Sequence, residues 1–362
     1  MKITIIAGAR PNFVKIASLI SAIQEEQRTN FALTYRLVHT GQHYDKAMSE
    51  SFFEELGISE PDANLACGGG THSEQTAKIL VAFELELLAN PADLLIVVGD
   101  VNSTMACAIV AKKLNIKVAH VEAGIRSLDR SMPEEINRLV TDSITDYFFT
   151  TSKYANENLE REGISKERIF YVGNTMIDTL LKNEAKFRKP DFFDKYNLVH
   201  KEYFVLTLHR PSNVDHKEYL VNLLTTLDNT CTVPIIFPVH PRTAQKIKEY
   251  NIVLNSIIQV SPMSYLEFNY LVKNSKAVIT DSGGITEETT VMQIPCITLR
   301  DSTERWETVY EGTNVLVGDN LNLLEDKIKI INEGQWRKGT IPDLWDGNAG
   351  QRIVQTLVKL SI

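Results

Sequence analysis

Charged side chains that could transfer protons gather between Val118 and Arg138. A short apolar strand leads into this stretch, a helical pattern follows it, and a loop lies between the two. In α/β proteins, ligands bind at the loops that leave the carboxyl ends of parallel strands. We therefore interpret this stretch as the chemical centre of the chain. Its titratable and charged residues are His120, Glu122, Arg126, Asp129, Arg130, Glu134, Glu135 and Arg138.

Three carboxylates are candidates for general acid–base catalysis. Asp100 and Glu122 each follow a predicted strand, and Glu134 lies near the start of the next helix. Because the carboxyl ends of parallel strands meet at one edge of a sheet, these side chains can converge, and carboxylates that share a dry cleft raise one another's pKa. Each of two residues has a simpler interpretation that remains open. Asp100 could be only a loop or cap carboxylate. Glu134 could only complete a capping box with Ser131.

Ser282, Gly283 and Gly284 follow another predicted strand and open a helix, an arrangement that binds anions. Glycines let the backbone approach a ligand closely, and the free N–H groups and dipole of a helix N-terminus favour negative charge. Glu287 and Glu288 lie in the first turn of this helix. They either complement the helix dipole or accept hydrogen bonds from the ribose hydroxyls of a nucleotide.

Two further pairs of side chains could meet a phosphate group. Arg10 and Lys15 flank the helix after the first strand, where they are either solvated or bind a phosphate at the helix N-terminus. His209 and His240 end two strands of the second half and could bind phosphate or transfer a proton. The chain contains neither GxGxxG nor a P-loop motif, so the sequence supports no nicotinamide fingerprint and no P-loop.

Metal ligation is a weaker alternative. His39, His43, His120 and Glu122 are ligand types, but they match no known zinc spacing, so we expect no metal. The cysteines are far apart and form no CxxC pair, which predicts buried thiols in a reducing compartment. They are Cys67, Cys107, Cys231 and Cys296.

Composition narrows the class of protein. The chain has 362 residues, a net charge of -8 and a hydrophobic content of 43%. A nucleic-acid binder more often has a basic surface, so that class is disfavoured. No apolar run approaches the roughly 18 residues that a membrane span needs. Met1 leads straight into a strand pattern, so we expect no signal peptide and a cytoplasmic protein.

Strand and helix patterns alternate through both halves of the chain. This alternation predicts an α/β protein with two doubly wound parallel-sheet domains that face across a cleft. We place the first domain at residues 1–175, the second at 176–345, and a C-terminal helix that could return to the first domain at 346–362. The predicted strands are Lys2–Ala7, Thr34–Thr40, Asp93–Val98, Val118–Val121, Tyr147–Thr151, Ile169–Val172, Tyr203–Leu208, Pro234–Val239, Ile257–Val260, Ala277–Thr280, Pro295–Leu299 and Val315–Val317.

Two segments have apolar residues along one face, a pattern that predicts a helix. The face of the first helix contains Phe13, Ile16, Ala17 and Ile20. The face of the helix after the charged loop contains Ile136, Leu139, Val140 and Ile144.

The order of these motifs resembles that of the non-hydrolysing UDP-N-acetylglucosamine 2-epimerases. Each motif alone is weakly specific, whereas the ordered set is specific and runs from Gly8 to about Arg352. The motifs are Gly8-x-Arg10-Pro11 with Lys15, Gly99-Asp100, His120-Val121-Glu122-Ala123-Gly124-x-Arg126, Pro133-Glu134-Glu135-x-Asn137-Arg138, His209-Arg210, His240-Pro241, Asp281-Ser282-Gly283-Gly284-x-x-Glu287-Glu288 and Thr303-Glu304-Arg305.

The resemblance implies a GT-B-type fold and a reaction at C2 of a UDP-sugar. In that family a carboxylate removes the C2 proton while UDP leaves C1, which gives 2-acetamidoglucal. Protonation from the other face and re-addition of UDP then give UDP-N-acetylmannosamine. The resemblance implies no nicotinamide, metal or other cofactor, and homodimers are common in the family.

Roles follow from the motifs that match the family. Catalysis is assigned to Asp100, Glu122, Glu134 and His209. Substrate binding is assigned to Arg10, Lys15, Arg138, His240, Ser282, Gly283, Gly284, Glu288 and Arg305.

The chain departs from the family pattern in three places. Regulated members have Gln-His-Arg-Glu where this chain has Gln42-His43-Tyr44-Asp45, a difference that bears on a second, activating UDP-N-acetylglucosamine site. Trp306 stands where proline is usual and Thr286 where glutamine is usual, so contacts to the sugar can differ.

Other functions share parts of the pattern. A hydrolysing relative would release N-acetylmannosamine and UDP, and another epimerase would act on a modified sugar such as a UDP-2,3-diacetamido uronic acid. A GT-B-type glycosyltransferase would need an acceptor groove, for which the sequence gives no signal. A nucleotide-sugar binding module without catalysis is disfavoured, because carboxylates beside an anionic ligand add little to binding.

Overall fold

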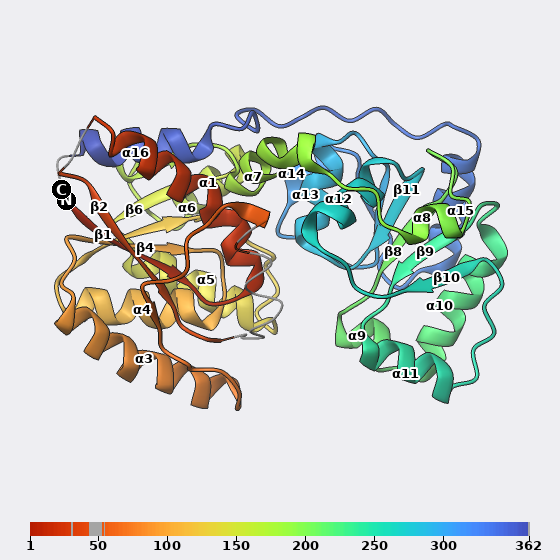
Figure 1. Cartoon of the computed structure of the whole chain (residues 1–362), viewed down its shortest axis with the longest axis horizontal. Coiled ribbons are helices and arrows are strands. Elements are labelled where there is room, and N and C mark those ends of the chain that lie inside the picture. The colour runs from red at the N-terminus through yellow and green to blue at the C-terminus, as the bar shows by residue number, and fades with distance from the viewer. Residues whose placement is uncertain (30–31, 43–52, 54, 361–362) are drawn as a thin grey trace. The chain divides into compact units, whose positions relative to one another are not determined.

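The computed structural model describes the chain except residues 30–31, 43–52, 54 and 361–362 (Figure 1). It contains two compact units. The first consists of Met1–Lys182 together with Asp343–Ile362, and the second of Asn183–Pro342. The boundaries between the units fall after residues 182 and 342, whereas the sequence predicted boundaries after residues 175 and 345.

The first unit contains a parallel sheet whose described strands follow the order β3-β2-β1-β4-β5-β6-β7. The order reverses between β1 and β4, which are neighbours in the sheet, and this reversal makes the sheet doubly wound. The strands are β1 (Lys2–Ala7), β2 (Thr34–His39), β3 (Ala63–Asn64), β4 (Leu94–Val98), β5 (Lys117–Val121), β6 (Tyr147–Thr150) and β7 (Ile169–Tyr171).

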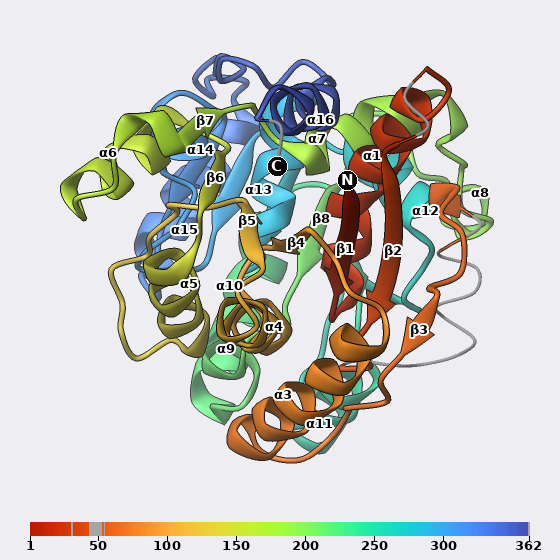
Figure 2. The same ribbon diagram turned by 90° about the vertical axis from the view of Figure 1, so that its left-hand side faces the viewer.

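Helices cover both faces of this sheet. Figures 1 and 2 show α1, α7 and α16 on one face and α3, α4 and α5 on the other. Every residue of β4 is buried, because a strand covered on both faces has no polar side. The helices are α1 (Arg10–Glu26), α3 (His72–Ala89), α4 (Asn102–Lys113), α5 (Pro133–Ile144), α6 (Lys153–Arg161), α7 (Thr175–Asn183) and α16 (Ala349–Lys359).

The last helix, α16, belongs to the first unit and packs against α1. The Asp178 carboxylate, on α7, accepts the N–H groups of Ala349 (3.1 Å) and Gly350 (2.7 Å) at the start of α16. Gly350 is needed there, because a Cβ atom would lie 2.9 Å from the Ser18 carbonyl oxygen. Burial raises the pKa of Asp178 above its ordinary value.

The second unit contains a parallel sheet with the described strand order β10-β9-β8-β11-β12-β13, which reverses between β8 and β11. The strands are β8 (Phe204–Thr207), β9 (Ile235–Pro238), β10 (Ile257–Val260), β11 (Ala277–Thr280), β12 (Cys296–Thr298) and β13 (Asn314–Leu316). The helices are α8 (Phe192–Lys195), α9 (Pro211–Val214), α10 (Lys217–Thr230), α11 (Pro241–Glu249), α12 (Tyr265–Lys273), α13 (Gly283–Val291), α14 (Trp306–Tyr310) and α15 (Leu321–Asn332).

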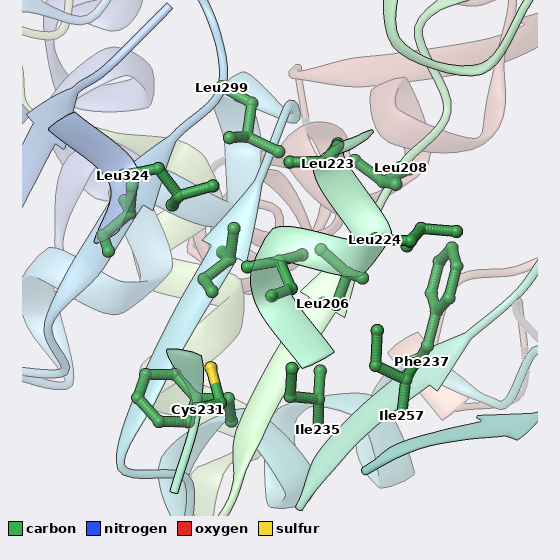
Figure 3. Packing of buried hydrophobic residues seen from close by; sticks show 14 of the residues in the cluster. Leu206, Leu208, Leu223, Leu224, Cys231, Ile235, Phe237, Ile257, Leu299 and Leu324 are labelled. Carbon is green, nitrogen blue, oxygen red and sulfur yellow. The ribbon is translucent and has the colours of Figure 1, made fainter. Parts of the chain in front are cut away.

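Aliphatic side chains hold α10 against this second sheet. Leu206 on β8, Leu223 and Leu224 on α10, and Ile235 on β9 are all fully buried and lie in one cluster (Figure 3). Full burial of one such side chain stabilises the fold by about 1.5–3 kcal/mol. The cluster therefore fixes the carboxyl ends of β8 and β11, from which candidate ligand-binding loops emerge.

The predicted fold class of two parallel-sheet α/β domains is confirmed. Each of the predicted strands is present, with ends within one residue of the prediction, and the two-residue strand β3 was missed. The predicted face of α1 and all four cysteines are buried, and the cysteines are unpaired. No helix among the described residues combines the length and hydropathy that crossing a bilayer requires.

Candidate active site

The candidate acid–base residues of the first unit come from loops after β4 and β5 and from the start of α5. Glu122 lies directly after β5 with a φ angle of +69°, a left-handed conformation that costs energy for a residue other than glycine. Its buried carboxylate forms an ion pair with the ammonium group of Lys15, which comes from α1. Strain of this kind gathers at functional sites, which agrees with the predicted importance of Glu122.

Gly99 lets this ion pair approach the end of β4. Its φ angle is +67°, and a Cβ atom on it would lie 3.1 Å from Lys15 Nζ and 3.2 Å from Glu122 Oε2. A side chain at this position would therefore push against both charged groups. The resemblance assigned Lys15 to substrate binding, but in the structure its ammonium group pairs with Glu122. The side chain of Arg10 lies outside the described residues, as do His43, Tyr44 and Asp45.

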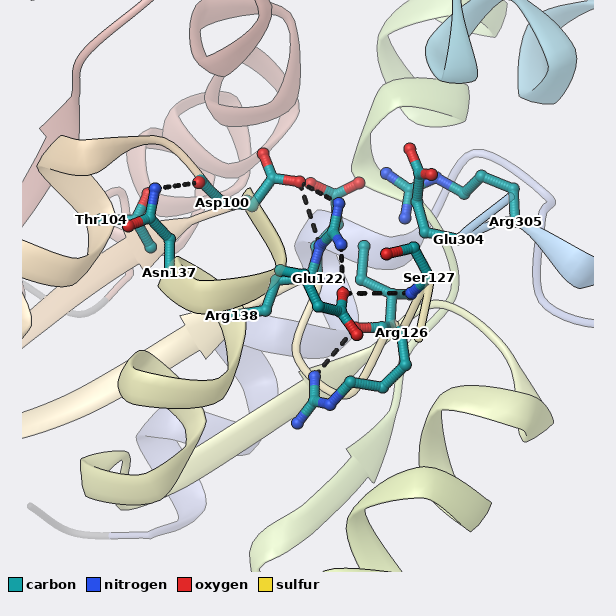
Figure 4. A network of polar contacts seen from close by, with 12 residues as sticks. Asp100, Thr104, Glu122, Arg126, Ser127, Asn137, Arg138, Glu304 and Arg305 are labelled. Carbon is teal, nitrogen blue, oxygen red and sulfur yellow. Dashed lines mark hydrogen bonds and ion pairs between the residues drawn. The ribbon is translucent and has the colours of Figure 1, made fainter. Parts of the chain in front are cut away.

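Arg138, on α5, contacts Asp100 (Figure 4), and it also contacts Glu135. Its Nε and Nη2 atoms lie 3.1 and 2.6 Å from Asp100 Oδ2, and its Nη1 atom lies 2.5 Å from Glu135 Oε2. Arg138 and Glu135 are fully buried, whereas the Asp100 side chain is 23% exposed. Asp100 is therefore held in place by a buried cation while part of its carboxylate remains accessible to a ligand.

Glu134 does not form the capping box that its spacing predicted as an alternative. The N-cap of α5 is Met132, which makes no side-chain cap, and Ser131 Oγ donates instead to Asp129 Oδ1 at 2.6 Å. The neighbouring Glu135 accepts backbone N–H groups from the preceding loop, those of Ser127 (3.1 Å) and Leu128 (3.0 Å). Glu134 is half-buried and has no capping role.

The helix predicted from Ile136, Leu139, Val140 and Ile144 is present as α5, but these apolar residues do not form its buried side. Ile136 is 50% exposed, and Leu139, Val140 and Ile144 are only partly buried. The fully buried side chains of this helix are polar or charged, because they support the loops of the site. They are Glu135, Asn137, Arg138, Thr141 and Asp142.

A second buried network lies beside Glu122 and was missed by the sequence analysis. His120 contacts Asp142 Oδ1 through Nδ1 at 2.6 Å and the Gly99 carbonyl oxygen through Nε2 at 2.8 Å. Arg126 continues the chain from Asp142 Oδ2 (2.7 Å) to the carboxylate of Glu162 (2.8 and 2.7 Å). Asp142 and Glu162 lie in no recognisable motif. Among the described residues, no three His, Cys, Asp or Glu side chains are arranged to hold a metal ion.

Asp281 organises the candidate ligand loops of the second unit. Its buried carboxylate accepts the backbone N–H groups of His209 (3.0 Å) and Arg210 (2.9 Å) and the side-chain amide of Asn213 (3.0 Å), and it pairs with the His209 ring. Burial would raise the pKa of Asp281, but the His209 contacts and the N–H donors lower it below its ordinary value. His209 itself is exposed, so its ring is available to a ligand.

Ser282 is the N-cap of α13 and makes no side-chain cap, while Gly283 and Gly284 form the first turn. A Cβ atom on Gly283 would lie 2.7 Å from Glu304 Oε1, so a side chain there would displace the end of Glu304. Glu304 in turn pairs with Arg300 at 2.7 Å. The N-terminus of α13 therefore has the glycines that the sequence analysis identified as suited to an anion.

Glu288 is a buried carboxylate whose partner is a neutral hydroxyl group. Its Oε1 atom accepts the hydroxyl of Tyr265 at 2.9 Å. Burial, with a smaller contribution from the neighbouring Glu287, raises the pKa of Glu288 to about 7 against the lowering effect of Tyr265. Glu287 pairs with Arg305 Nε at 2.9 Å, so Arg305 is already bound within the unit.

His240 has a structural role that the sequence did not predict. It is the N-cap of α11, and its Nδ1 atom accepts the N–H of Arg242 at 3.3 Å. A ring nitrogen that accepts a hydrogen bond in this way satisfies one of the free N–H groups at the start of the helix. The ring is exposed, and its other nitrogen is left for the predicted contact with substrate.

Comparisons with known proteins identify a family. The family model described as UDP-N-acetylglucosamine 2-epimerase matches residues 24–358. The chain is 44% identical to the UDP-N-acetylglucosamine 2-epimerase of Methanocaldococcus jannaschii, over 99% of each chain. It is 38% identical to the UDP-2,3-diacetamido-2,3-dideoxy-D-glucuronate 2-epimerase of Pseudomonas aeruginosa, over 99% of this chain and 100% of that one.

Solved structures agree with the sequence comparisons. The fold is similar to the crystal structure of the M. jannaschii UDP-GlcNAc 2-epimerase in complex with UDP-GlcNAc and UDP, with a TM-score of 0.89 and 43% identity over 99% of this chain and 100% of that one. It is also similar to the Neisseria meningitidis enzyme bound to UDP-GlcNAc, with a TM-score of 0.88 and 27% identity over 99% and 100% of the two chains. The glycosyltransferase of kitacinnamycin, at 7% identity and a TM-score of 0.62, shares only the fold.

Proposed function

The chain belongs to the UDP-N-acetylglucosamine 2-epimerase family of isomerases, and from this premise we propose that it interconverts UDP-N-acetylglucosamine and UDP-N-acetylmannosamine. The observation that carries the proposal is the set of three carboxylates near the end of the first sheet, each in a different environment. Glu122 is buried against Lys15, Asp100 is partly exposed and held by Arg138, and Glu134 is half-buried and caps nothing.

Glu122 is proposed to remove the C2 proton. The Lys15 ammonium group balances the charge of its carboxylate in the buried site, so the carboxylate can act as a base without water around it. As the C2–H bond breaks, its electron pair forms the C1–C2 double bond. The C1–O bond breaks at the same time, and its electron pair leaves with UDP, which gives 2-acetamidoglucal.

Asp100 and Glu134 are proposed to provide the acid for the return step. A proton delivered to C2 from the opposite face, followed by attack of a UDP oxygen on C1, gives the epimer with no net change in atoms or charge. Asp100 is suited to this step because Arg138 fixes its position while leaving the carboxylate partly exposed.

The second unit is proposed to hold UDP. Ser282, Gly283 and Gly284 would direct the N–H groups of α13 at the diphosphate, and Glu288 would accept the ribose hydroxyls. His209, which Asp281 orients, would stabilise the negative charge that develops on the departing UDP. The M. jannaschii enzyme is 43% identical in sequence, and its crystal structure contains UDP-GlcNAc and UDP, which supports this assignment of the ligand.

A second candidate substrate is a UDP-2,3-diacetamido uronic acid. The P. aeruginosa relative that bears this activity in its name is 38% identical over nearly the whole chain. The chemistry at C2 would be the same, so the carboxylate roles would not change. The two substrates differ at C3 and C6 of the sugar, so a direct comparison of turnover with both separates the candidates.

Proton NMR in D2O tests the proposal. The purified protein is incubated with UDP-N-acetylglucosamine, and we expect deuterium at C2 of a mixture of two intact UDP-sugars. Accumulation of free UDP and N-acetylmannosamine would instead assign the protein to the hydrolysing relatives. If neither exchange nor cleavage occurs with this sugar, the same measurement with the diacetamido uronic acid follows, and inertness toward both would overturn the proposal.

A further inference from the structure

We infer that His120 and Asp142 are positioning residues for the epimerase site, and that His120 fulfils this role as an imidazolium ion. The inference rests on the proposed catalytic roles of Asp100 and Glu122, because the pair contacts the loops that carry them. Neither residue belongs to the proposed catalytic or substrate-binding residues, and neither needs to contact the sugar.

The His120–Asp142 pair ties two loops of the site together. His120 Nε2 lies 2.8 Å from the carbonyl oxygen of Gly99, the residue directly before Asp100. Asp142 Oδ2 accepts the N–H of Gly124, two residues after Glu122, at 3.0 Å. The contact between His120 Nδ1 and Asp142 Oδ1, at 2.6 Å, closes the connection. The backbone positions of both proposed catalytic carboxylates therefore depend on one buried pair.

Counting protons gives the charge state of His120. A carbonyl oxygen can only accept a hydrogen bond, so Nε2 must carry a proton to contact Gly99. Asp142 receives Gly124 N–H at Oδ2 and forms an ion pair there with the permanently charged Arg126 at 2.7 Å, which favours the ionised carboxylate. Its other oxygen therefore also accepts, and Nδ1 must carry a proton too. A ring with both nitrogens protonated is an imidazolium ion.

The surroundings balance this buried charge. The chain Glu162–Arg126–Asp142–His120 contains two anions and two cations, and only Glu162 reaches solvent substantially. On the neighbouring strands β4 and β6, His120 is opposite Val97 and Phe148, which carry no charge. Burial would raise the pKa of Asp142, but His120 and Arg126 lower it below its ordinary value, in agreement with an ionised carboxylate.

Loss of the imidazolium charge would release the Gly99 turn. A neutral ring has one N–H group and cannot donate to both Gly99 and Asp142. Gly99 is also the residue whose missing side chain leaves room for the Lys15–Glu122 pair. A shift of this turn would therefore move both Asp100 and the pair, and a displacement of about 1 Å can cost about 100-fold in rate.

The test compares His120→Gln and Asp142→Asn with the control Asp146→Asn. Asp146 ties the other end of β5, where it accepts Lys112 Nζ at 2.8 Å and Val118 N–H at 2.8 Å. We expect kcat and the C2 exchange rate to fall about 10- to 100-fold in the first two variants, and the Kd for UDP, measured by titration calorimetry, to stay within about twofold. The control should lose melting temperature but keep its kcat.

Nitrogen NMR of histidine-labelled wild-type protein tests the charge state without any substitution. We expect both His120 ring nitrogens to carry a proton in the folded protein at about pH 7.5. This measurement keeps the inference testable if a variant does not fold. A neutral ring near about pH 7.5 would overturn the inferred charge.

Rates of the variants separate the remaining outcomes. If Glu122→Gln loses C2 exchange while His120→Gln keeps the wild-type rate, the proposed function stands and the positioning role is refuted. If Glu122→Gln itself keeps the exchange, the assignment on which the inference rests has failed. An equal loss of kcat in Asp146→Asn would show that any damage to β5 lowers the rate, and would also refute the positioning role.

Discussion

The two units hold buried carboxylates near the ends of their strands with different partners. In the first unit the partners are cations: Lys15 for Glu122, and Arg138 for both Asp100 and Glu135. In the second unit Glu287 and Glu304 also pair with arginines, but Asp281 and Glu288 have mainly neutral donors. Asp281 accepts backbone N–H groups and an amide in addition to its contact with His209. Glu288 accepts a tyrosine hydroxyl.

The neutral partner of Glu288 gives this carboxylate a different pH behaviour. A cation at contact distance favours the charged form of a carboxylate, whereas burial beside a neutral group favours the protonated form. The pKa of Glu288 accordingly rises to about 7, with burial as the main cause. We infer that Glu288 changes charge near neutral pH.

Glu122→Gln should abolish most of the activity and leave UDP binding intact. An amide cannot accept the C2 proton, so we expect a loss of about 100- to 10,000-fold in C2 exchange, measured by proton NMR in D2O. The substitution also leaves the buried Lys15 ammonium group without its anion. Breaking a buried pair in this way costs about 3–5 kcal/mol, so the melting temperature should fall as well.

The double variant Lys15→Met with Glu122→Gln separates these two effects. It removes the uncompensated cation, so we expect the melting temperature to recover toward that of the wild type. The exchange rate should remain as low as in the single variant, since the base is still absent. Recovery of the exchange rate together with the stability would contradict a catalytic role for Glu122.

The sequence was sufficient to locate the loops that carry these residues. Asp100, Glu122 and Ser282 were recognised because each lies in a loop after a buried apolar strand, and the carboxyl ends of parallel strands lie at one edge of a sheet. The strands themselves were predictable because helices cover both faces, which gives nearly continuous apolar runs such as β4. Only β3, with two residues, has too short a pattern to detect.

The partners of the carboxylates could not be predicted in the same way. An apolar stripe normally marks the buried face of a helix, but α5 buries Glu135, Arg138 and Asp142 and exposes Ile136. The three charged residues are spaced three and four positions apart, so they share one side of the helix. That spacing was a usable signal. What it could not reveal is that the side faces the sheet, because this depends on tertiary pairing with His120, Arg126 and the loop after β4.

Glu288 should make stability depend on pH in a direction opposite to that of a paired carboxylate. Its pKa rises from an ordinary 4.5 to about 7 in the folded protein, so the folded state binds more protons than the unfolded state between these values. Stability therefore falls as pH rises through this window, by up to about 3 kcal/mol at 1.36 kcal/mol per pKa unit. Chemical denaturation from about pH 4.5 to pH 8 measures it.

Glu288→Gln provides the matched control for this pH dependence. The amide has nearly the same size and can still contact the Tyr265 hydroxyl, but it does not titrate. We expect the difference in unfolding free energy between the variant and the wild type to grow in favour of the variant as pH rises toward 8. A difference that stays constant with pH would show that Glu288 is ionised throughout, and would remove the contrast between the two units.

Glu134→Gln should have the smallest effect on stability, although its neighbour is essential to the fold. Glu134 caps no helix, so its substitution should change the unfolding free energy by less than about 0.5 kcal/mol. Glu135→Gln removes the ion pair with Arg138 and weakens the acceptor for two loop N–H groups, and should cost about 1–3 kcal/mol. Thermal denaturation of both variants measures the difference.

Turnover should nevertheless fall in Glu134→Gln, because a proposed proton donor is lost without damage to the fold. If its turnover falls only in proportion to a lower melting temperature, Glu134 is structural, and the acid of the return step must be Asp100 alone.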